Sequence, residues 1–232
     1  LNSVLYEAVV ASNAQYNGAA GEIQAGLEAL DRRWMAAATD KDSPVYETLN
    51  NPAAAELRRF QHQFPNLAEV FLTDRHGALV AAAARTTDYY QADEAWWQAV
   101  NAGQGDHYIG APMFDDSAGI LGVRLAVPVY SEDQTTVIGV LATTYHVAAL
   151  EEALNVVIDD DSNLWVALLL PSGYWLRPAE DQFEAVPGSA WADLRTATAS
   201  PYTVLDFEDA SYLVSQADVA TLTQEPSVAA LG

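Results

Sequence analysis

The stretch "GVRLAVPVYSEDQTTVIGVLATTYHV", residues 122–147, decides the fold of this chain. Its two runs of apolar and β-branched residues, 122–131 and 135–147, flank the polar segment "EDQ". Runs of this kind, separated by a short polar segment, are typical of neighbouring antiparallel strands. The sequence therefore predicts two long strands that are joined by this turn.

The segments upstream of this strand pair predict a second hairpin and two short helices. Residues 68–84, "AEVFLTDRHGALVAAAA", contain two apolar runs around a turn at Asp74–Gly77, which indicates a β-hairpin. Residues 51–64 predict a helix that has its N-cap at Asn51 and a proline in its first position. Residues 92–103, "ADEAWWQAVNAG", predict another helix, which begins with acidic residues.

The first part of the chain predicts one long helix. Apolar residues recur at spacings of three and four over residues 1–37. A continuous helix of that length would span about 55 Å. Gly18, Gly21 and Gly26 each disfavour a helix by up to about 1 kcal/mol. The alternative is therefore an ordinary first helix with a kink at these glycines.

A second set of strands is predicted in the last third of the chain. The pattern begins again after residue 162, with predicted strands at 164–170, 174–177, 201–208 and 210–219. A connecting helix is predicted at 148–157, and a short strand at 107–112. Two antiparallel sheets then follow the first helix, with a boundary between residues 150 and 162. The predicted fold class is α+β.

The composition excludes several classes of function. The chain has 32 acidic and 10 basic residues and a formal net charge of −22. That charge argues against binding to nucleic acid or to an anionic membrane, since both need Lys and Arg. The acidic residues are dispersed, so solubility or a high-salt habitat explains them as well as a ligand does. The chain has no Cys, which excludes disulfides, zinc–thiolate sites and thiol nucleophiles.

No metal, cofactor or enzymatic activity is expected. The four His residues, at positions 62, 76, 107 and 146, form no i, i+4 pair of the kind that binds a metal. No nucleophile elbow or catalytic triad is recognisable. No stretch reaches the roughly 20 apolar residues of a membrane span, and no signal peptide is visible.

Five motifs, in this order and spacing, resemble a known family. They are "VFLTDRHGALVA" (70–81), "TTDYYQADEAWWQAV" (86–100), "YIGAPMFDDSAG" (108–119), "RLAVPVY" (124–130) and "VIGVLATTYHVAAL" (137–150). Together they resemble the distal half of a double Cache (dCache) sensor domain, the extracytoplasmic ligand-binding region of many microbial histidine kinases and chemoreceptors. Residues 1–150 are well covered by this resemblance, and residues 151–232 match the membrane-proximal half in outline.

The resemblance implies a domain organisation and a cellular setting. It implies a stalk helix and loop in residues 1–50 and two PAS-like antiparallel sheets, the distal one in 51–150. The proximal one lies in 151–232 and lacks its last strand. The chain would be an excised piece of a longer receptor, anchored in the cell membrane by flanking transmembrane helices. A homodimer through the N-terminal helix is also expected.

The resemblance also implies a ligand site in the distal half. In amino-acid-binding members the covering segment reads Arg, any residue, Trp, then Tyr, with an Asp two positions on. The Arg and the aromatic residues hold the ligand carboxylate, and a later Asp holds its ammonium group. Trp96 falls on the Trp of this motif, Trp97 on the Tyr and Asp115 on the later Asp. Glu94 stands in place of the Arg, and Ala99 in place of the first Asp.

This departure favours a cationic ligand. A ligand carboxylate would meet Glu94 instead of a bidentate guanidinium, which is unfavourable. Aromatic faces, in contrast, attract a desolvated cation by about 0.5–2 kcal/mol each. An organic amine or another small cation is therefore expected. The predicted ligand-binding residues are Tyr89, Asp93, Glu94, Trp96, Trp97, Tyr108, Phe114, Asp115 and Tyr145.

Structural explanations stand beside these functional ones. Asp93 and Glu94 favour the first turn of a helix whether or not a ligand exists. Trp96 and Trp97 point about 100° apart on a helix, so one of them is expected in the core. Asp115 can cap the turn in "FDDSAG".

Three functions are left open by the sequence. The favoured one is the extracytoplasmic sensor domain of a signal receptor, which binds a small polar metabolite, with an organic amine or other cation favoured, and has no catalytic role. The alternatives are an interaction or dimerisation module without a ligand, and a sensor of amino acids or carboxylates. Arg124 is expected at the surface or in a salt bridge. A closed cavity lined by Trp96 or Trp97 and Asp115 would separate the sensor from the interaction module.

Overall fold

A computed structural model describes most of the chain. The described residues are 2–103, 107–155, 166–176, 183–186, 190–192, 194, 203–207 and 210–215. The chain divides into two compact units, Leu1–Phe183 and Glu184–Gly232. The cavity described below lies entirely in the first unit.

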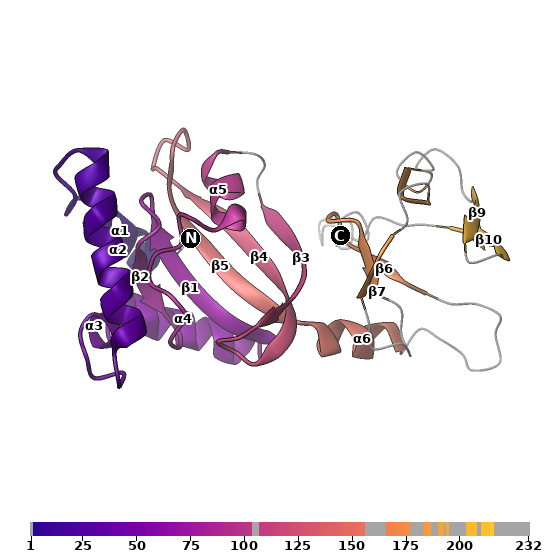
Figure 1. The fold of residues 1–232 in the computed structure, drawn as a ribbon, viewed down its shortest axis with the longest axis horizontal. Helices are drawn as coiled ribbons and strands as arrows, with labels where there is room; N and C mark the ends of the chain where they lie inside the picture. The colour runs from indigo at the N-terminus through magenta and orange to yellow at the C-terminus, as the bar shows by residue number, and fades with distance from the viewer. Residues whose placement is uncertain are drawn as a thin grey trace, which may run out of the picture. The chain divides into compact units, whose positions relative to one another are not determined.

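A five-stranded antiparallel sheet forms the centre of the first unit (Figure 1). Its strands follow the order β2-β1-β5-β4-β3, so that β1 and β5 are neighbours although they are far apart in the sequence. The strands are β1 (Leu67–Asp74), β2 (Leu79–Ala82), β3 (Tyr108–Asp115), β4 (Ile120–Tyr130) and β5 (Val137–His146). The predicted pairs β1–β2 and β4–β5 are confirmed.

Local turn chemistry explains both hairpins. At the β1–β2 turn, Asp74 accepts hydrogen bonds from the backbone N–H groups of His76 and Ala78, at 2.8 and 3.1 Å. Gly77 has a φ of 79°, a conformation that favours glycine. At the β4–β5 turn, the N–H of Ser131 donates to the carbonyl of Thr136 at 2.8 Å.

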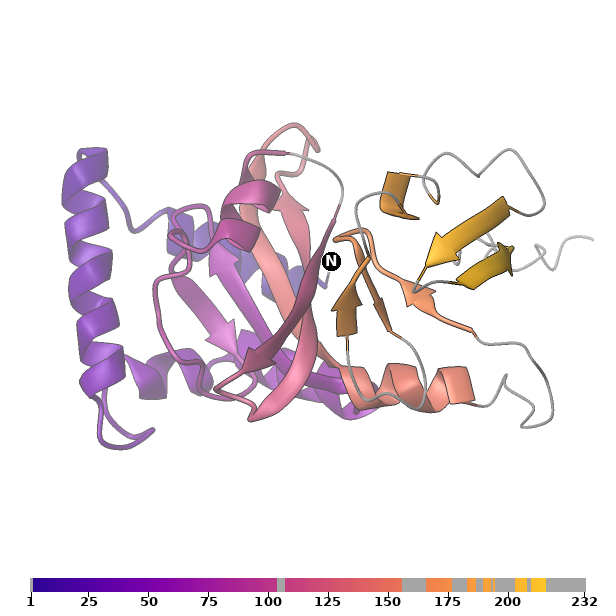
Figure 2. The same cartoon turned by 45° about the vertical axis from the view of Figure 1, so that its right-hand side comes forward.

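The two faces of the sheet bury different hydrophobic cores, because successive side chains of a strand point to opposite faces. One core contains Val70 and Leu72 of β1 and residues of α1 (Ser3–Asn13) and α4 (Pro52–Gln63). The other contains Phe71 of β1 and residues of α2 (Ala20–Ala36), α3 (Val45–Leu49) and α5 (Ala95–Asn101). Figure 2 shows these helices around the sheet from a second direction. The predicted α+β fold class is thereby confirmed.

The prediction of one continuous N-terminal helix is wrong. Two helices, α1 and α2, are separated by residues 14–19, and α2 has 17 residues. Asn13 explains where α1 ends: its side chain donates to the carbonyl of Ile138 at 2.7 Å and accepts from the N–H of Arg75 at 3.1 Å. Both partners belong to the sheet region, so these bonds hold the end of α1 against it. Of the three glycines where an interruption was the alternative, Gly18 lies in the break, whereas Gly21 and Gly26 lie within α2.

The remaining described elements agree in outline with the predicted second set of strands. Helix α6 (Val147–Asn155) follows β5 directly, and β6 and β7 form an antiparallel pair. The short strands are β6 (Leu168–Leu169), β7 (Tyr174–Leu176), β8 (Phe183–Ala185), β9 (Thr203–Phe207) and β10 (Ala210–Val214). Strands β9 and β10 form the expected antiparallel pair. Residues 164–165 and Arg177 lie outside the described residues, and the subdomain limits at 50 and 150 stay predictions.

In the described part of the chain, no helix combines the length and the apolar character needed to cross a membrane.

The close contact of α1 with the sheet predicts opposite effects for two glycine substitutions. A Cβ added at Gly139 of β5 would overlap the carbonyl oxygen of Thr73 and lie 2.9 Å from Val9 of α1. Gly139→Ala should therefore lower the free energy of unfolding by about 1–3 kcal/mol. Gly26→Ala, in α2 with no atom within 4 Å of the added Cβ, should raise it by about 0.5–1 kcal/mol. Urea unfolding followed by circular dichroism measures both; equal effects of the two substitutions would contradict the packing described.

Candidate functional site

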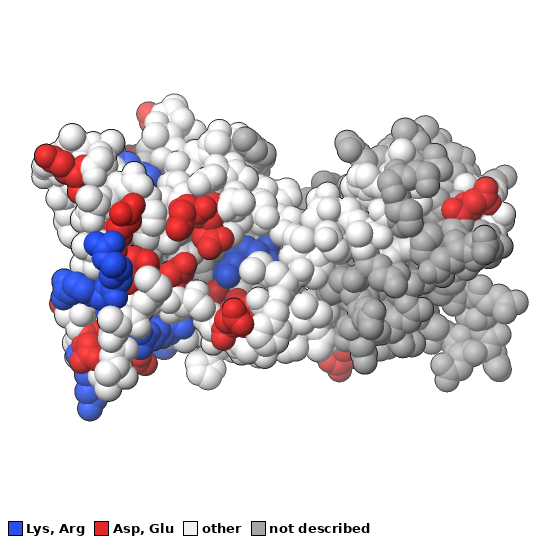
Figure 3. Space-filling model, in the orientation of Figure 1, with Lys and Arg blue, Asp and Glu red and all other residues white. Residues whose placement is uncertain are grey.

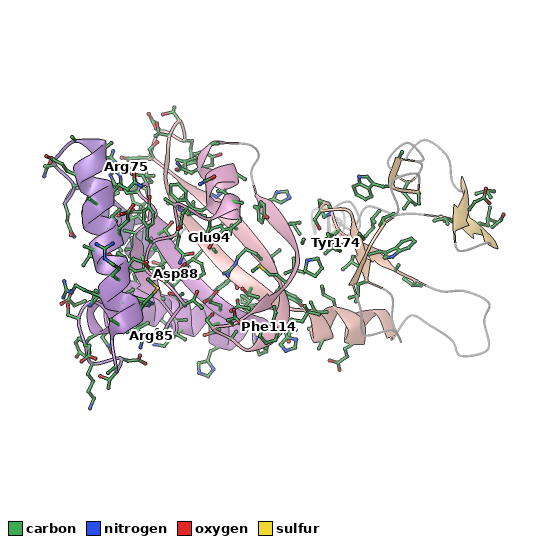
Figure 4. The ribbon with its side chains drawn as sticks, viewed as in Figure 1. Arg75, Arg85, Asp88, Glu94, Phe114 and Tyr174 are labelled. Carbon is green, nitrogen blue, oxygen red and sulfur yellow. The ribbon has the colours of Figure 1, made fainter. Side chains whose placement is uncertain are left out.

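A cavity of about 120 Å³ lies on the face of the sheet that carries Phe71 and is covered by α5. Its lining comes from β1 (residues 69 and 71), the segment before α5 (86–88 and 91), residues 94 and 96, the end of β3 with the turn that follows it (113–117), and residue 124. Figure 4 labels Asp88, Glu94 and Phe114, which belong to three of these parts. Segments far apart in the sequence therefore meet at one hollow.

A row of polar side chains crosses the floor of this cavity. Thr144 of β5 pairs with Glu69 of β1 on one side and with Arg124 of β4 on the other. The three side chains therefore share one face of the sheet. In the next row of the same face, Phe71 pairs with Ala142, a small residue. The strand register alone thus brings a carboxylate, a guanidinium and an aromatic ring together.

Arg124 is buried between two acids and two aromatic rings. Its Nη1 donates to Glu69 Oε2 at 2.7 Å, and its Nη2 lies 3.6 Å from Asp115 Oδ2. Its guanidinium carbon lies 5.2 Å from the ring centre of Phe71 and 5.6 Å from that of Trp96. Only 12% of the side chain is exposed. A charge-assisted hydrogen bond to Glu69, the ion pair with Asp115 and the cation–π contacts stabilise this position.

Asp115 joins the β3–β4 turn to this ion cluster. Its carboxylate accepts hydrogen bonds from Ser117 Oγ at 2.6 Å, from Thr144 Oγ1 at 2.6 Å and from the N–H of Ala118 at 3.1 Å. Burial alone would raise the pKa of Asp115, but these hydrogen bonds and Arg124 outweigh it and lower the pKa below its ordinary value. Asp115 is therefore ionised at neutral pH.

For Glu69, unlike Asp115, the effect of burial on the pKa outweighs that of its hydrogen-bonding partners. Burial raises the pKa of Glu69 above its ordinary value, although Arg124 and the hydroxyl of Ser117 both favour the ionised form. The nearby charge of Asp115 adds to the increase. Two acids thus share one guanidinium, and the cluster carries excess negative charge when both are ionised.

Three further acids line the cavity without a basic partner in the described part of the chain: Asp88, Glu94 and Asp116. Burial raises the pKa of Asp88 to about 6, helped by the charges of Asp31, Glu94 and Asp93, and opposed by a hydrogen bond from Gln91. Figure 3 shows acidic side chains on this face of the molecule, in the region where Figure 4 labels Asp88 and Glu94. The outer part of the cavity is therefore strongly negative.

Helix α2 holds the wall that carries Asp88. Asp31 Oδ1 accepts hydrogen bonds from the N–H groups of Tyr89 and Tyr90, at 2.7 and 3.1 Å. One turn further on, Trp34 Nε1 donates to the carbonyl of Thr86 at 2.9 Å. The segment before α5 is thus bound to α2 by backbone groups on both sides of Asp88.

Four of the nine predicted ligand-binding residues line the cavity: Glu94, Trp96, Phe114 and Asp115. Trp96 is 6% exposed and packs edge-on against Phe71, at 5.8 Å between ring centres. Asp115 also caps the "FDDSAG" turn, so its structural explanation holds beside the functional one. Glu94 is the N-cap of α5 but makes no side-chain capping bond.

The structure places the other five predicted residues outside the cavity lining: Tyr89, Asp93, Trp97, Tyr108 and Tyr145. Trp97 is core, as expected for one of the adjacent tryptophans; its Nε1 donates to Thr73 Oγ1 at 3.0 Å. Tyr89 is buried against Trp34, at 5.8 Å between ring centres. Tyr145 follows Thr144 on β5 and therefore belongs to the opposite face. Asp93 is exposed, and Tyr108 packs against the edge of the core.

Glu69, Phe71 and Asp88 line the cavity but were not predicted from the sequence. Arg124 was not predicted at the site either, although its predicted salt bridge is confirmed. Strand alternation could have found two of them, because Glu69 and Phe71 are two residues apart on β1 and share a face. Nothing local marks Asp88, whose environment depends on Asp31 of α2.

The described residues contain no group of three or more side chains placed to hold a metal ion.

The buried cluster predicts that two neighbouring acids differ in importance for stability. Asp115→Ala would leave Arg124 with Glu69 alone and remove the acceptor of the turn, so the free energy of unfolding should fall by about 3–5 kcal/mol. Asp116→Ala removes the same charge from an exposed position and should change it by no more than about 0.5 kcal/mol. Urea unfolding of both variants at pH 7 measures this, and similar small losses would show that the cluster does not stabilise the fold.

No family model matches the chain, and no curated protein matches its sequence. Solved structures do match. The extracellular domain of rpHK1S-Z16, a protein assigned as a histidine kinase, is 15% identical over 92% of this chain and 85% of its own, with a TM-score of 0.56. An extracellular ligand-binding receptor from Desulfohalobium retbaense is 14% identical over 90% of this chain and 36% of its own, with a TM-score of 0.51.

A third solved structure is the ligand-binding domain of the Pseudomonas fluorescens chemoreceptor CtaA in complex with L-leucine. It is 13% identical over 93% of this chain and 89% of its own, with a TM-score of 0.48. The first two similarities extend over almost the whole chain and agree with the observed sheet and helices. The chain therefore has the Cache-type fold of extracellular ligand-binding sensor domains.

Proposed function

We propose that this chain is the extracytoplasmic sensor domain of a transmembrane signal receptor, and that its cavity binds a small organic cation. The fold supports the sensing role, since the solved structures that share it are extracellular domains of receptors. The observation that carries the ligand class is the charge of the cavity lining. Flanking membrane helices and a homodimer remain predictions of this proposal.

The charge of the lining favours cations over anions. Five carboxylates line the cavity, and Arg124 is the one basic side chain among the described residues there. Asp115 and Glu69 already neutralise Arg124, so a ligand carboxylate would meet excess negative charge at every wall. An ammonium group would instead supply the charge-assisted hydrogen bonds that the outer acids lack, at about 1.5–3 kcal/mol each.

The volume limits the ligand to a small molecule. The cavity, at about 120 Å³, is well below the roughly 300–1,000 Å³ of pockets that hold drug-sized ligands. Its wall contains the edge of Trp96 and the exposed ring of Phe114, which can contact the carbon atoms of an amine. A primary amine of a few carbon atoms, with or without a hydroxyl group, matches both size and charge.

A route from the cavity to the rest of the domain runs through α2. An ammonium group at Asp88 would act on the segment that Asp31 and Trp34 hold. A ligand can shift the domain between two states only through different affinities for them. In this proposal the two states differ in how that segment and α2 are placed.

One observation favours the alternative, an interaction module without a ligand. Arg124 already occupies the space between Phe71, Trp96 and Asp115, where the sequence led us to expect a ligand cation. The two functions differ in whether the outer carboxylates bind a cation, which binding measurements decide.

The proposal predicts that small amines stabilise the protein and that matched anions do not. Propylammonium and 2-aminoethanol should raise the melting temperature in a saturable way at pH 7, whereas propionate should leave it unchanged. Affinity should fall about tenfold from pH 7 to pH 5, because Asp88, with a pKa of about 6, loses its charge over that interval. Thermal-shift titrations at the two pH values provide the measurement. Stabilisation by propionate but not by amines would overturn the ligand class.

Substitution of Asp88 gives the matched control. Since the pKa of Asp88 is raised in the fold, its ionisation destabilises the ligand-free protein as pH rises through about 6. Asp88→Asn should therefore raise the melting temperature at pH 7, yet weaken amine binding and remove most of its pH dependence. Glu132→Gln removes an exposed acid from the β4–β5 turn and should change neither property.

A further inference from the structure

Arg124 stands where a bound cation would be most stable. Two aromatic rings, Phe71 and Trp96, lie 5.2 and 5.6 Å from its guanidinium carbon. Glu69 and Asp115 lie on its Nη1 and Nη2 sides, at 2.7 and 3.6 Å. These four side chains form a complete cation subsite at the inner end of the cavity, and we call them the inner cage.

The inner cage is built by the sheet and not by Arg124 itself. Glu69 and Phe71 are fixed by the β1–β5 register, and Asp115 is held by Ser117, Thr144 and the backbone of Ala118. Trp96 is fixed on α5 by burial. None of these contacts needs the guanidinium, so the inner cage can persist when Arg124 is shortened.

We infer that Arg124 is a specificity-determining residue, which fills the inner cage with its own guanidinium and so restricts the ligand to the outer carboxylates. This inference rests on the proposed function, because it divides the proposed cation site into an occupied inner part and an open outer part. The ligand selected in this way is a small cation with one charged end. Cations that need the inner cage, such as alkylguanidiniums or longer diamines, are excluded by Arg124.

The hydrogen bonding of the Arg124 guanidinium agrees with the inference that this side chain fills the inner cage. It is buried and has no hydrogen-bond partner among the described residues, whereas both terminal nitrogens face acids. Both terminal nitrogens of the guanidinium therefore face carboxylates of the protein itself. They are not arranged to bind the two oxygens of a ligand carboxylate. An Arg placed to bind an anion would not be enclosed by two acids.

Removal of Arg124 should expose the inner cage to a cation from solution. Arg124→Ala deletes an ethylguanidinium-sized group and so opens space for the charged end of a guanidinium probe. Millimolar n-propylguanidinium should therefore bind this variant at least tenfold more tightly than it binds the wild type. Arg124→Met, which keeps much of the volume, should show no such gain. Arg59→Ala removes the same charge from an exposed pair with Glu56 and should behave as wild type. Isothermal titration calorimetry, with propylammonium as the second probe, measures the affinities.

The outcomes separate this inference from the proposed function. If Arg124→Ala folds and gains no affinity for n-propylguanidinium, while the wild type binds propylammonium, Arg124 does not set specificity. If the wild type binds no amine but Arg124→Ala binds n-propylguanidinium, the inner cage is a cation site and the proposed function is wrong. If Arg124→Ala unfolds, restoration of a cooperative thermal transition by n-propylguanidinium supports the inference. Without that restoration, Arg124→Thr, which is small and suits a strand, replaces it in the titration, and absence of a gain there overturns the inference.

Discussion

The burial of Arg124 in the central sheet is the constraint on which the cavity depends. A guanidinium that is 12% exposed must have acids nearby, and the register of β1, β5 and β4 supplies Glu69 beside it. Asp115 completes the cluster and at the same time fixes the β3–β4 turn that forms the opposite wall. One ion cluster therefore joins the charged floor of the cavity to the turn that forms its wall.

The outer part of the cavity has a different physical character. Its acids are not needed to neutralise Arg124. Burial raises the pKa of Asp88 to about 6, and the charges of Asp31, Glu94 and Asp93 add to the increase. Groups held at a cost to stability are typical of sites that await a ligand. The segment that carries Asp88 is hydrogen-bonded to Asp31 and Trp34 of α2, so the acid with the raised pKa lies on a part of the wall that is tied to this helix.

Much of the fold could be predicted from the sequence because its signals are local. The hairpins follow from apolar runs around the turns at Asp74–Gly77 and 132–134, and both pairs are confirmed. The break between α1 and α2 was foreseen only as the alternative of an interruption at the glycines, of which Gly18 lies in it. The end of α1 at Asn13 could not be predicted, since Asn13 bonds to Ile138, which lies far along the chain. Only part of the candidate site was predicted. Trp96 and Asp115 line the cavity as expected, but the guanidinium of Arg124 lies against them, where a ligand cation was expected. That exchange depends on strand register, which the sequence does not specify by itself.

The most direct test of the account is a pH titration of the carboxyl groups of the ligand-free protein by carbon-detected NMR. It reports whether the cavity holds negative charge that the protein leaves uncompensated. The account predicts that Asp88 titrates at about 6, well above its ordinary value of 3.8, and that Asp115 titrates below that value. Titration of Asp88 at or below 3.8 would contradict it, because a nearby cation would then already satisfy the outer acids.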